Sequence, residues 1–542
     1  MSKLFERLVN ARGLTPDFLS PKYEQLEDPF ILPDMKKAVD RLKTAIKSDE
    51  KILIYGDYDV DGVTASATME ETLKLAGVKP ENIEIMLPDR FIDGYGMSPK
   101  LIKRAEQQGI KLVITVDCGS RNHEIVDELN TLKIDTIITD HHEVGDTLPE
   151  AIAIINPKRK DFTNENLKNL AGVGVVFKFA QALAREDLIK NGQEKWLLDL
   201  VLIGTVCDSM PLIGENHILG FYGLKVLQKT RRPGLKELMK KAGVKNLHSE
   251  SIGFQIGPRL NAAGRLKSAE LSLNLLRTAD EPQAAALAES LNELNKKRKT
   301  EQNLATKEIE QRGEKPEPVI IEVGNWHEGI LGIVTGRLVD RYEKPAFVLT
   351  EVENGILKGS ARSFGDFNLA DALNFAKNSI ITGGGHSAAA GVKLEQKNLY
   401  NFREQINEYY HSLNLKDQKQ YLKKQPDLDL EDLSELTLDF LDELKTLEPF
   451  GLGNEEPIFR LKNIQIAEIR TMGADQNHLR LDIKDHQGKT LKLIAFFAPE
   501  KWLNLTYEAK IEPIIKLTEN DFNGVKSVEA QIIDIVIHSL TF

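Results

Sequence analysis

The chain has 542 residues, which corresponds to three or four domains of ordinary size. Its composition, 41% hydrophobic and 28% charged, is typical of folded globular protein and excludes wholesale disorder and a fibrous repeat. The 71 Lys and Arg against 82 Asp and Glu give a formal net charge of −11. This balance argues against a protein that coats duplex DNA by charge alone, but it leaves room for a local basic groove.

Cysteine usage and hydropathy limit the compartment. The two cysteines cannot form a disulfide framework, and this favours a reducing environment. No apolar run reaches the roughly 18 residues that a membrane-spanning helix needs, and the N-terminus lacks an apolar signal core. We therefore expect a cytoplasmic enzyme or nucleic-acid factor that makes no membrane contact.

Strand-like and helix-like segments alternate in the first third of the chain. Strands are expected at 51–56, 83–87, 111–119, 135–140 and 151–156, and helices at 62–76, 98–109 and 121–133. This alternation is typical of an α/β fold with a doubly wound, mostly parallel sheet. In such a sheet, ligands bind beyond the carboxyl ends of the strands.

The remainder of the chain changes character several times. Between Pro282 and Gly313 the sequence contains no Gly or Pro, and this predicts one long helix over 282–313. The segment GEKPEP then ends this helix. Residues 319–410 return to a mixed α/β pattern, and the acidic, leucine-rich stretch 426–446 predicts a helix that connects domains. Five strand-like segments follow in about 85 residues, which suggests a small closed barrel of the OB type.

The densest polar motif, GDYDVDG, directly follows the first predicted strand and contains Asp57, Asp59 and Asp61. Three carboxylates packed at alternate positions repel one another, and a divalent cation relieves this repulsion. The alternative is a polar turn in which Asp61 caps the following helix.

Further polar clusters lie at the ends of other apolar segments. Asp117 follows one predicted strand, the triplet Asp140-His141-His142 follows another, and Asp208 ends an apolar helical run. These clusters would meet at one edge, and their convergence by chance is improbable. Carboxylate oxygens with one or two imidazoles suit Mn²⁺ or Mg²⁺. Such ligands around two cations are a recurring arrangement for phosphate-ester hydrolysis.

These motifs carry a resemblance. GDYDVDG, VDCG, TDHHE and CDSMP, in this order and spacing, resemble the DHH phosphoesterase superfamily. Segments such as PDRFIDGYG, IGPRLNAAGRL, GSARS, GGGHSAAAG and LEPFGLGNEEPIF resemble its RecJ family of 5′→3′ single-stranded-DNA exonucleases. The resemblance runs from about residue 28 to the end of the chain.

The resemblance implies roles for the polar clusters. His142 would face the scissile phosphate as an acid or charge stabiliser, Asp140 would orient the histidine pair, and Asp117 would lie between two metals. Which of Asp57 and Asp59 binds which metal stays open. The implied metal ligands are Asp57, Asp59, Asp61, Asp117, His141 and Asp208.

Candidate substrate-binding residues lie outside these clusters. Arg90 either holds phosphate or is an ordinary surface arginine, and Tyr95 either stacks on a base or packs in the core. Arg259, Asn261 and Arg265 are expected in a Gly-punctuated loop, where two guanidinium groups suit phosphate capture, and the alternative is a structural ion pair. The resemblance to the RecJ family favours contact with phosphate.

The second α/β domain contributes another group of candidates. The resemblance implies that Ser360 and Arg362, together with Arg90, hold the 5′-terminal phosphate. Gly384, Gly385 and His386 belong to GGGH, in which successive backbone amides can form an anion nest.

The expected organisation is a DHH phosphoesterase domain at 1–275, a connecting helix at 276–312, a DHH-associated substrate-binding domain at 313–412, a linker helix at 413–450 and an OB-fold domain at 451–542. We expect a monomeric exonuclease for DNA repair and recombination that uses two divalent cations, Mn²⁺ or Mg²⁺, to release 5′-mononucleotides. A single-strand-binding protein or a helicase is a candidate partner. The alternatives are a DHH hydrolase of short oligoribonucleotides or cyclic dinucleotides, and a non-catalytic replication scaffold.

Overall fold

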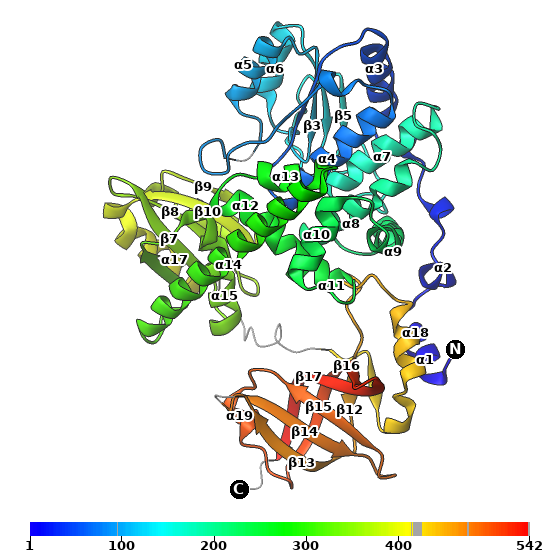
Figure 1. The fold of residues 1–542 in the computed structure, drawn as a ribbon. Helices are drawn as coiled ribbons and strands as arrows, with labels where there is room; N and C mark the ends of the chain where they lie inside the picture. Colours follow the sequence, from blue (N-terminus) through cyan, green and yellow to red (C-terminus); the bar gives the residue numbers. More distant parts are fainter. Residues whose placement is uncertain (95, 414, 416–424, 474–475, 540–542) are drawn as a thin grey trace. The chain divides into compact units, whose positions relative to one another are not determined.

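Five parallel strands form the first sheet, in the order β2-β1-β3-β4-β5 (Figure 1). Their bounds are β1 Ile52–Tyr55, β2 Ile83–Met86, β3 Leu112–Val116, β4 Asp135–Thr139 and β5 Ala153–Ile155. The computed structural model describes residues 1–94, 96–413, 415, 425–473 and 476–539. The chain forms two compact units, residues 1–231 with 243–257 and 424–542, and residues 232–242 with 258–423.

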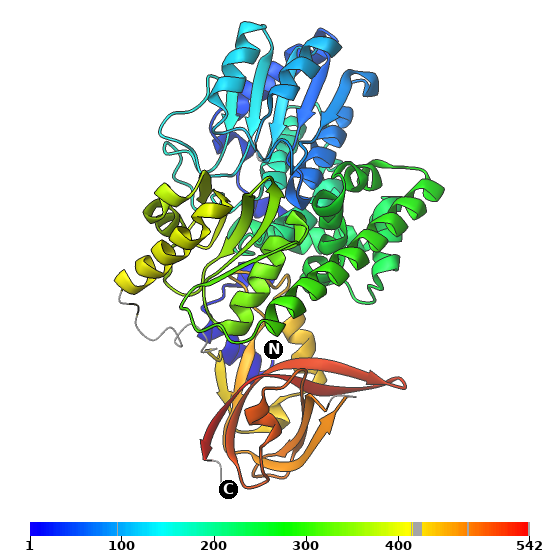
Figure 2. The same cartoon turned by 90° about the vertical axis from the view of Figure 1, so that its left-hand side faces the viewer.

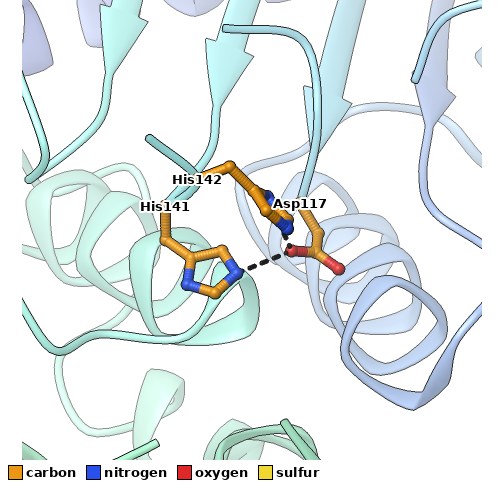
Figure 3. Close-up of side chains that lie close together, drawn as sticks. All are labelled: Asp117, His141 and His142. Carbon is orange, nitrogen blue, oxygen red and sulfur yellow. Dashed lines mark ion pairs between the residues drawn. The ribbon is translucent and has the colours of Figure 1, made fainter. Parts of the chain in front are cut away.

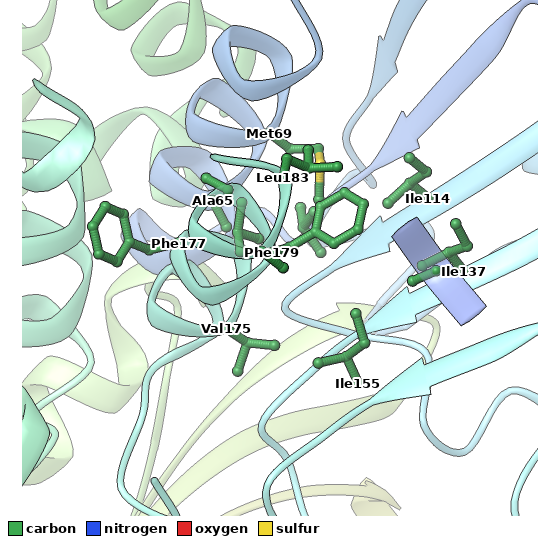
Figure 4. Close-up of a cluster of buried hydrophobic side chains, with 14 of the residues drawn as sticks. Ala65, Met69, Ile114, Ile137, Ile155, Val175, Phe177, Phe179 and Leu183 are labelled. Atoms are coloured by element: carbon green, nitrogen blue, oxygen red, sulfur yellow. The ribbon is translucent and has the colours of Figure 1, made fainter. Parts of the chain in front are cut away.

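Helices cover both faces of this sheet, as the alternation of segments predicts. Successive side chains along a strand point to opposite faces of the sheet, so that Ile52 lies in one core and Leu53 in another. Figure 4 shows the core on one face, where Met69 and Phe179 pack against strand side chains such as Ile137. That face is covered by α3 (Met35–Lys47), α4 (Val60–Leu75) and α7 (Gly172–Arg185), and the other face by α5 (Pro99–Gln108) and α6 (His123–Thr131).

Further helices pack beside α4 and α7 in the same unit. Helix α8 (Leu198–Cys207) is apolar and almost wholly buried, and α9 (Gly214–Gln228) packs against it. The short α11 (Ser249–Ser251) leads into a π-helical turn, η5 (Ile252–Ile256), that contacts α8. These elements place the end of α8 beside the sheet.

The second unit contains the predicted long helix and a mixed sheet. Helix α14 (Glu281–Gln311) starts at Asp280, whose side chain accepts a hydrogen bond from the Gln283 amide. The sheet has the order β6-β7-β8-β10-β9. Its strands are β6 Ile320–Gly324, β7 Ala346–Glu353, β8 Ile356–Arg362, β9 Thr382–Gly385 and β10 Ala389–Glu395. Its helices are α10 Pro233–Ala242, α12 Gly257–Leu266, α13 Glu270–Arg277, α15 Leu331–Tyr342, α16 Leu369–Phe375 and α17 Leu399–Ser412.

The C-terminal sheet has more strands than the five expected. Its order is β11-β12-β16-β17-β15-β14-β13. The first expected strand is divided near Asn463, which takes the left-handed conformation with φ of 55°. The bounds are β11 Leu428–Leu430, β12 Ile458–Leu461, β13 Gln465–Met472, β14 His478–Lys484, β15 Thr490–Ala495, β16 Lys510–Phe522 and β17 Val525–Ser539. Figure 2 shows the long β16–β17 hairpin in red, and Asn523–Gly524, both with positive φ, form its turn.

Two segments outside the expected barrel contribute to its core. The stretch expected to form a linker helix contains strand β11 and the helix α18 (Leu438–Lys445), and Phe440 of α18 is fully buried. Helix α1 (Lys3–Ala11), from the opposite end of the chain, adds Leu4 and Phe5 to the same core. Apolar faces of short helices thus close the sheet on one side. Among the described helices, none combines the length and apolar character needed to span a membrane.

Candidate functional site

The polar clusters meet at the carboxyl edge of the first sheet. Asp57 lies two residues after β1, Asp117 directly after β3, and Asp140-His141-His142 directly after β4. Because all these strand pairs are parallel, their carboxyl ends share one edge. The strands carry buried apolar side chains, so the first polar residue after each strand emerges at the same level.

Helix ends hold two of the three carboxylates in GDYDVDG. Asp59 is the N-cap of α4 and accepts a hydrogen bond from the Gly62 amide at 3.1 Å. Asp61 lies in the first turn of α4, and its two oxygens accept the amide protons of Gly172 and Val173 at 2.7 and 3.0 Å. These amides form the N-terminus of α7, whose dipole favours a negative charge. The N-cap in this motif is therefore Asp59, whereas Asp61 caps a different helix.

Asp117 belongs to two groups of candidate ligands and lies next to both histidines (Figure 3). Its Oδ1 lies 3.1 Å from His141 Nε2 and 3.8 Å from His142 Nδ1. Its φ is 61°, a conformation that is uncommon for residues other than glycine and concentrates at functional sites. A Cβ on Gly172 would lie 2.6 Å from the Asp117 Cβ, so only glycine fits at the start of α7.

The ligand atoms form overlapping groups, each with atoms within 4.8 Å of one another. One group contains Asp57, Asp59 and Asp117, and a second contains Asp61, His141 and Asp208. Asp117 also groups with the two histidines, so it connects the groups. Asp208 caps the end of α8 and places its Oδ2 3.6 Å from His141 Nε2.

Without a bound cation, the surroundings of this cluster favour the protonated form of its carboxylates. Burial, with the charge of Asp61, raises the pKa of Asp117 well above its usual value, and burial with Asp59 does the same for Asp57. Burial and the neighbouring carboxylates raise the pKa of Asp61 to about 7 and that of Asp208 to about 8. The causes are loss of hydration and mutual repulsion, which a bound cation reverses.

Unsatisfied atoms show that these residues fit divalent cations. Asp57 Oδ1, Asp117 Oδ1 and His141 Nε2 are buried and make no hydrogen bond. Burial and the charge of His142 lower the pKa of His141 to about 4, so this imidazole is neutral near pH 7 and its lone pair is available. Aspartate oxygens with one imidazole suit Mn²⁺ or Mg²⁺.

Asp140 orients the second histidine. Its Oδ1 accepts the amide protons of His141 and His142 and lies 2.9 Å from His142 Nδ1. Burial alone would raise the pKa of Asp140, but the hydrogen bond and charge of His142 hold it below its usual value. Burial alone would lower the pKa of His142, but Asp140 raises it to about 9. His142 is thus a cation beside the carboxylates.

Sequence reasoning missed two residues that support this pair. Asn156 follows β5, is fully buried, and donates to the His142 carbonyl at 2.9 Å and to Ser120 Oγ at 2.8 Å. The Ser120 amide donates to Asp140 Oδ2 at 3.0 Å. A polar residue directly after the fourth predicted strand, in AIAIIN, was the available signal.

Arg90 belongs to the loop that follows β2, at the same sheet edge. Its guanidinium carbon lies 5.0 Å from the centre of the Tyr58 ring, and its charge lowers the pKa of Asp57 against the larger effect of burial. The sequence analysis also missed Tyr58, which lies between two candidate ligands. Tyr95 lies outside the described residues, so its proposed stacking role stays a prediction.

In the second unit, the expected loop with Arg259, Asn261 and Arg265 is helix α12. Arg259 Nε donates to Asn292 Oδ1 at 3.1 Å, and an Arg265 amino group lies 3.4 Å from the Gly329 carbonyl. The loop expectation was wrong because the two glycines lie at helix-compatible positions, one of them the first residue of α12.

Ser360 and Arg362 lie together near the end of β8. Arg362 donates to Ser360 Oγ at 3.3 Å and to the Ala361 carbonyl at 2.8 Å. A Cβ on Gly332, in the first turn of α15, would lie 3.1 Å from Ser360 Oγ and 3.2 Å from an Arg362 nitrogen. A guanidinium beside a helix N-terminus favours a phosphate.

The glycine motif forms an edge strand. Gly384 and Gly385 belong to β9 and pair with β10, and the His386 amide donates to the Ala389 carbonyl at 2.8 Å. All three residues are exposed. The structure thus shows a hairpin at this position, and the anion-binding role stays a prediction.

Comparison with known proteins agrees with this geometry. Residues 51–205 match the family described as the DHH family, N-terminal domain, residues 317–412 match the DHHA1 domain, and residues 427–534 match the RecJ OB domain. The DHH match contains every residue of the cluster except Asp208, and the DHHA1 match contains Ser360 and Arg362.

Curated relatives match most of the chain. The single-stranded-DNA-specific exonuclease RecJ of Bacillus subtilis is 36% identical over 96% of this chain and 65% of its own length, slightly less than two thirds. The Escherichia coli protein of the same name is 33% identical over 92% of this chain and 89% of its own length.

Solved structures lead to the same family. The crystal structure of Thermus thermophilus RecJ with Mn²⁺ matches with a TM-score of 0.83 and 27% identity, over 98% of this chain and 75% of that one. The same protein with Mg²⁺ matches with a TM-score of 0.78 and 25% identity, over 98% and 74%. This chain therefore belongs to the RecJ family of DHH phosphoesterases.

Proposed function

We propose that this chain is a metal-dependent 5′→3′ exonuclease that hydrolyses single-stranded DNA and releases 5′-mononucleotides. The observation that carries the proposal is the pair of ligand groups around Asp117, next to a histidine whose pKa is raised to about 9. The single-stranded-DNA-specific exonucleases named above supply the substrate class.

The ligand groups assign roles to the residues of the cluster. Asp57, Asp59 and Asp117 would hold one divalent cation, and Asp61, His141 and Asp208 another, with Asp117 placed to contact both. Two such cations activate a water and stabilise the attacking and leaving oxygens of a phosphodiester. His141, neutral near pH 7, offers its Nε2 without prior loss of a proton.

His142 serves the phosphate itself. Its protonated ring offsets negative charge on the scissile phosphate, and it holds a proton for the leaving oxygen. Asp140 fixes the ring through Nδ1, which leaves Nε2 as the atom that reaches substrate. Asn156 and Ser120 hold this pair in place through their hydrogen bonds, an indirect positioning role.

End recognition would give the polarity. Arg90, Ser360 and Arg362 are the residues that we assign to the 5′-terminal phosphate, because each carries a hydrogen-bond donor suited to a phosphate oxygen. Arg259, Asn261, Arg265 and the GGGH residues are assigned to the following nucleotides. An enzyme anchored on the terminal phosphate removes one nucleotide at a time from that end.

We extend the proposal to the setting of the enzyme. The composition, with two cysteines, favours action in the cytoplasm. A single-strand-binding protein or a helicase is the class of partner that supplies single strands in repair and recombination, and we expect a monomer. We retain the limits of the DHH domain at 1–275, the connecting helix at 276–312 and the DHH-associated domain at 313–412, whereas β11 and α18, within the expected linker at 413–450, are assigned to the C-terminal domain because their side chains join its core.

A time course on single-stranded DNA labelled at its 3′ end tests the activity and its polarity together. With Mn²⁺, the labelled strand should shorten from its 5′ end as a ladder, and EDTA or a blunt duplex should prevent shortening. A label released at once as a mononucleotide would indicate attack from the 3′ end and contradict the polarity. Cleavage restricted to dinucleotides would instead favour a hydrolase of short oligonucleotides.

A further inference from the structure

The motif LEPFGLGNEEPIF has no role in the chemistry above, although it is one of the segments that resemble the family. Its first part, Leu447–Asn454, forms a closed loop that we call the brace loop. The Asn454 side chain donates to the carbonyls of Leu447 and Pro449 at 2.8 and 2.9 Å, and the Gly451 amide donates to the Asn454 carbonyl at 2.9 Å. Leu447 is fully buried in the C-terminal core, so the loop is fixed to that domain.

The brace loop contacts the chain that follows Asp208. The Leu212 amide donates to the Leu452 carbonyl at 2.7 Å. A Cβ on Gly451 would lie 2.7 Å from Leu212 Cδ1, so the backbone of the loop lies directly against this side chain. Leu212 is four residues after Asp208, and the loop therefore fixes the segment that leaves the metal-site residue.

The same loop contacts α11. The Ser249 hydroxyl donates to the Phe450 carbonyl, and His248 Nδ1 lies 2.9 Å from Glu448 Oε1. Helix α11 continues into η5, which packs on the last turn of α8, the helix that Asp208 ends. The brace loop thus contacts both the segment that follows Asp208 and the helix α11, which leads into the element packed on α8.

Helix α9 completes the support. A Cβ on Gly220 would lie 2.6 Å from the Pro449 Cγ. The proline ring therefore packs directly against the backbone of α9, where only glycine leaves enough space. The proline ring is rigid, and a larger side chain at this position would displace the brace loop.

The Asp208 side chain is held by fewer hydrogen bonds than that of Asp61, the other carboxylate of its ligand group. The oxygens of Asp61 accept two amide protons, whereas within the described residues the Asp208 carboxylate accepts no hydrogen bond. Its side chain is also 28% exposed. Its place 3.6 Å from His141 therefore depends on the position of its backbone at the end of α8.

We propose that the brace loop is a positioning element for Asp208, through which the C-terminal domain sets the affinity of the cation site. The inference rests on the cation site of the proposed function, and the candidate ligand groups contain no brace-loop residue. A loop displaced from Leu212 and α11 lets the end of α8 move, and the Asp208 oxygen then leaves its partners.

Gly220→Ala in the full chain tests this inference. Alanine favours the α9 helix over glycine, so the substitution displaces Pro449 without weakening α9 itself. Titration of Mn²⁺ by calorimetry or electron paramagnetic resonance should show affinity weakened at least three-fold. KM for a 5′-phosphorylated dinucleotide should stay unchanged. Gly336→Ala, in α15, is the matched control, since a Cβ there meets nothing within 4 Å, and it should bind Mn²⁺ like wild type.

Ser249→Ala provides a second, milder variant in case Gly220→Ala does not fold. It removes one hydrogen bond to the brace loop and should weaken Mn²⁺ binding in the same direction. Wild-type affinity in the folded variants, with only a lower melting temperature, would show that the loop is merely structural and overturn the inference. A wild-type chain that binds Mn²⁺ without cutting single-stranded DNA would reject the proposed function alone.

Discussion

Two acidic regions of this chain differ in how their carboxylates are partnered. At the edge of the first sheet, Asp57 and Asp117 are buried, each with an oxygen that makes no hydrogen bond. In the C-terminal domain, residues 427–542 contain 22 Asp and Glu against 12 Lys and Arg, nearly the whole net charge of the chain. There many carboxylates form ion pairs that are at least partly exposed, such as Asp482 with Arg480 at 2.7 Å, and the buried Asp485 accepts amide protons.

This difference separates a functional site from an acidic surface. A buried carboxylate without a partner is costly, and several at one sheet edge are the pattern expected of a site that a ligand would complete. An exposed carboxylate costs little and contributes little. The net charge of −11 therefore says nothing about the active site, and burial without a partner identifies it. Substitutions in the two regions should therefore have very different effects.

Asp117→Ala should abolish hydrolysis, with a loss of at least about 10⁴-fold, because Asp117 belongs to both sides of the cluster. Without metal, the variant should be more stable than wild type, since it lacks a buried carboxylate that desolvation and Asp61 disfavour. The rate on single-stranded DNA and the melting temperature in EDTA measure both effects. A variant that is less stable than wild type in EDTA would contradict the view that the buried carboxylate of Asp117 destabilises the metal-free fold. Asp482→Ala, from the acidic surface, is the control and should retain activity.

His142→Ala should lower the rate by roughly 10²-fold to 10³-fold while Mn²⁺ binding stays close to wild type. The reason is that His142 acts on the phosphate, whereas His141 offers its nitrogen to the cation. His141→Ala is the matched variant and should weaken Mn²⁺ binding strongly. Equal loss of Mn²⁺ affinity in both variants would contradict the division of roles between the two histidines.

Arg362→Ala should reduce the preference for a 5′-phosphorylated end by about ten-fold, because it removes a guanidinium donor that suits a phosphate. The ratio of kcat/KM on phosphorylated and hydroxyl-ended strands measures this preference. Arg362→Lys should restore the charge and only part of the preference, since Lys lacks the forked geometry. The same ratio as wild type in the alanine variant would reject the role.

The metal-free protein should lose stability as the pH rises from about 6.5 to 8.5. Asp61 and Asp208 have folded pKa values of about 7 and 8, above the value of 3.8 in the unfolded chain. In this window the unfolded chain has released these protons already, so the folded state binds more protons and is destabilised as they leave. His142, with a folded pKa of about 9, acts in the same direction.

Melting temperatures in EDTA across this pH range measure the effect. Saturating Mn²⁺ should flatten the profile, because a cation stabilises the ionised carboxylates. The same decline in the presence and absence of Mn²⁺ would show that other groups cause it.

Arg480→Ala should change the free energy of unfolding by less than about 1 kcal/mol, since both side chains of its ion pair with Asp482 are partly exposed to solvent. Hydrolysis of a dinucleotide should be unaffected. Chemical denaturation measures the first quantity, and a destabilisation above about 2 kcal/mol would show that this pair is more than an ordinary surface ion pair. Arg480→Ala thus measures the effect of removing a paired charge, for comparison with the unpaired carboxylates of the cluster.

Much of the fold could be predicted from local pattern. The strands of the first sheet and the long helix α14 agree with the expected segments within a few residues, because fully apolar runs and uninterrupted helix formers are strong local signals. The C-terminal sheet was predicted less well. A left-handed Asn463 divides its first strand. In addition, β11 and α1, from outside the expected barrel, contribute to its core, and no local sequence pattern indicates this.

Residue types and their spacing in the chain were enough to predict which polar side chains gather at the sheet edge. Carboxylates and histidines after apolar strands predicted the cation ligands, since parallel strands end at one edge. The contacts that hold these side chains in place became visible only in the folded chain. The amides of α7 cap Asp61 across 111 residues, Asn156 supports His142 from another strand, and the brace loop reaches Leu212 from the C-terminal domain. Such contacts join residues distant in the chain, and no local pattern of side chains encodes them.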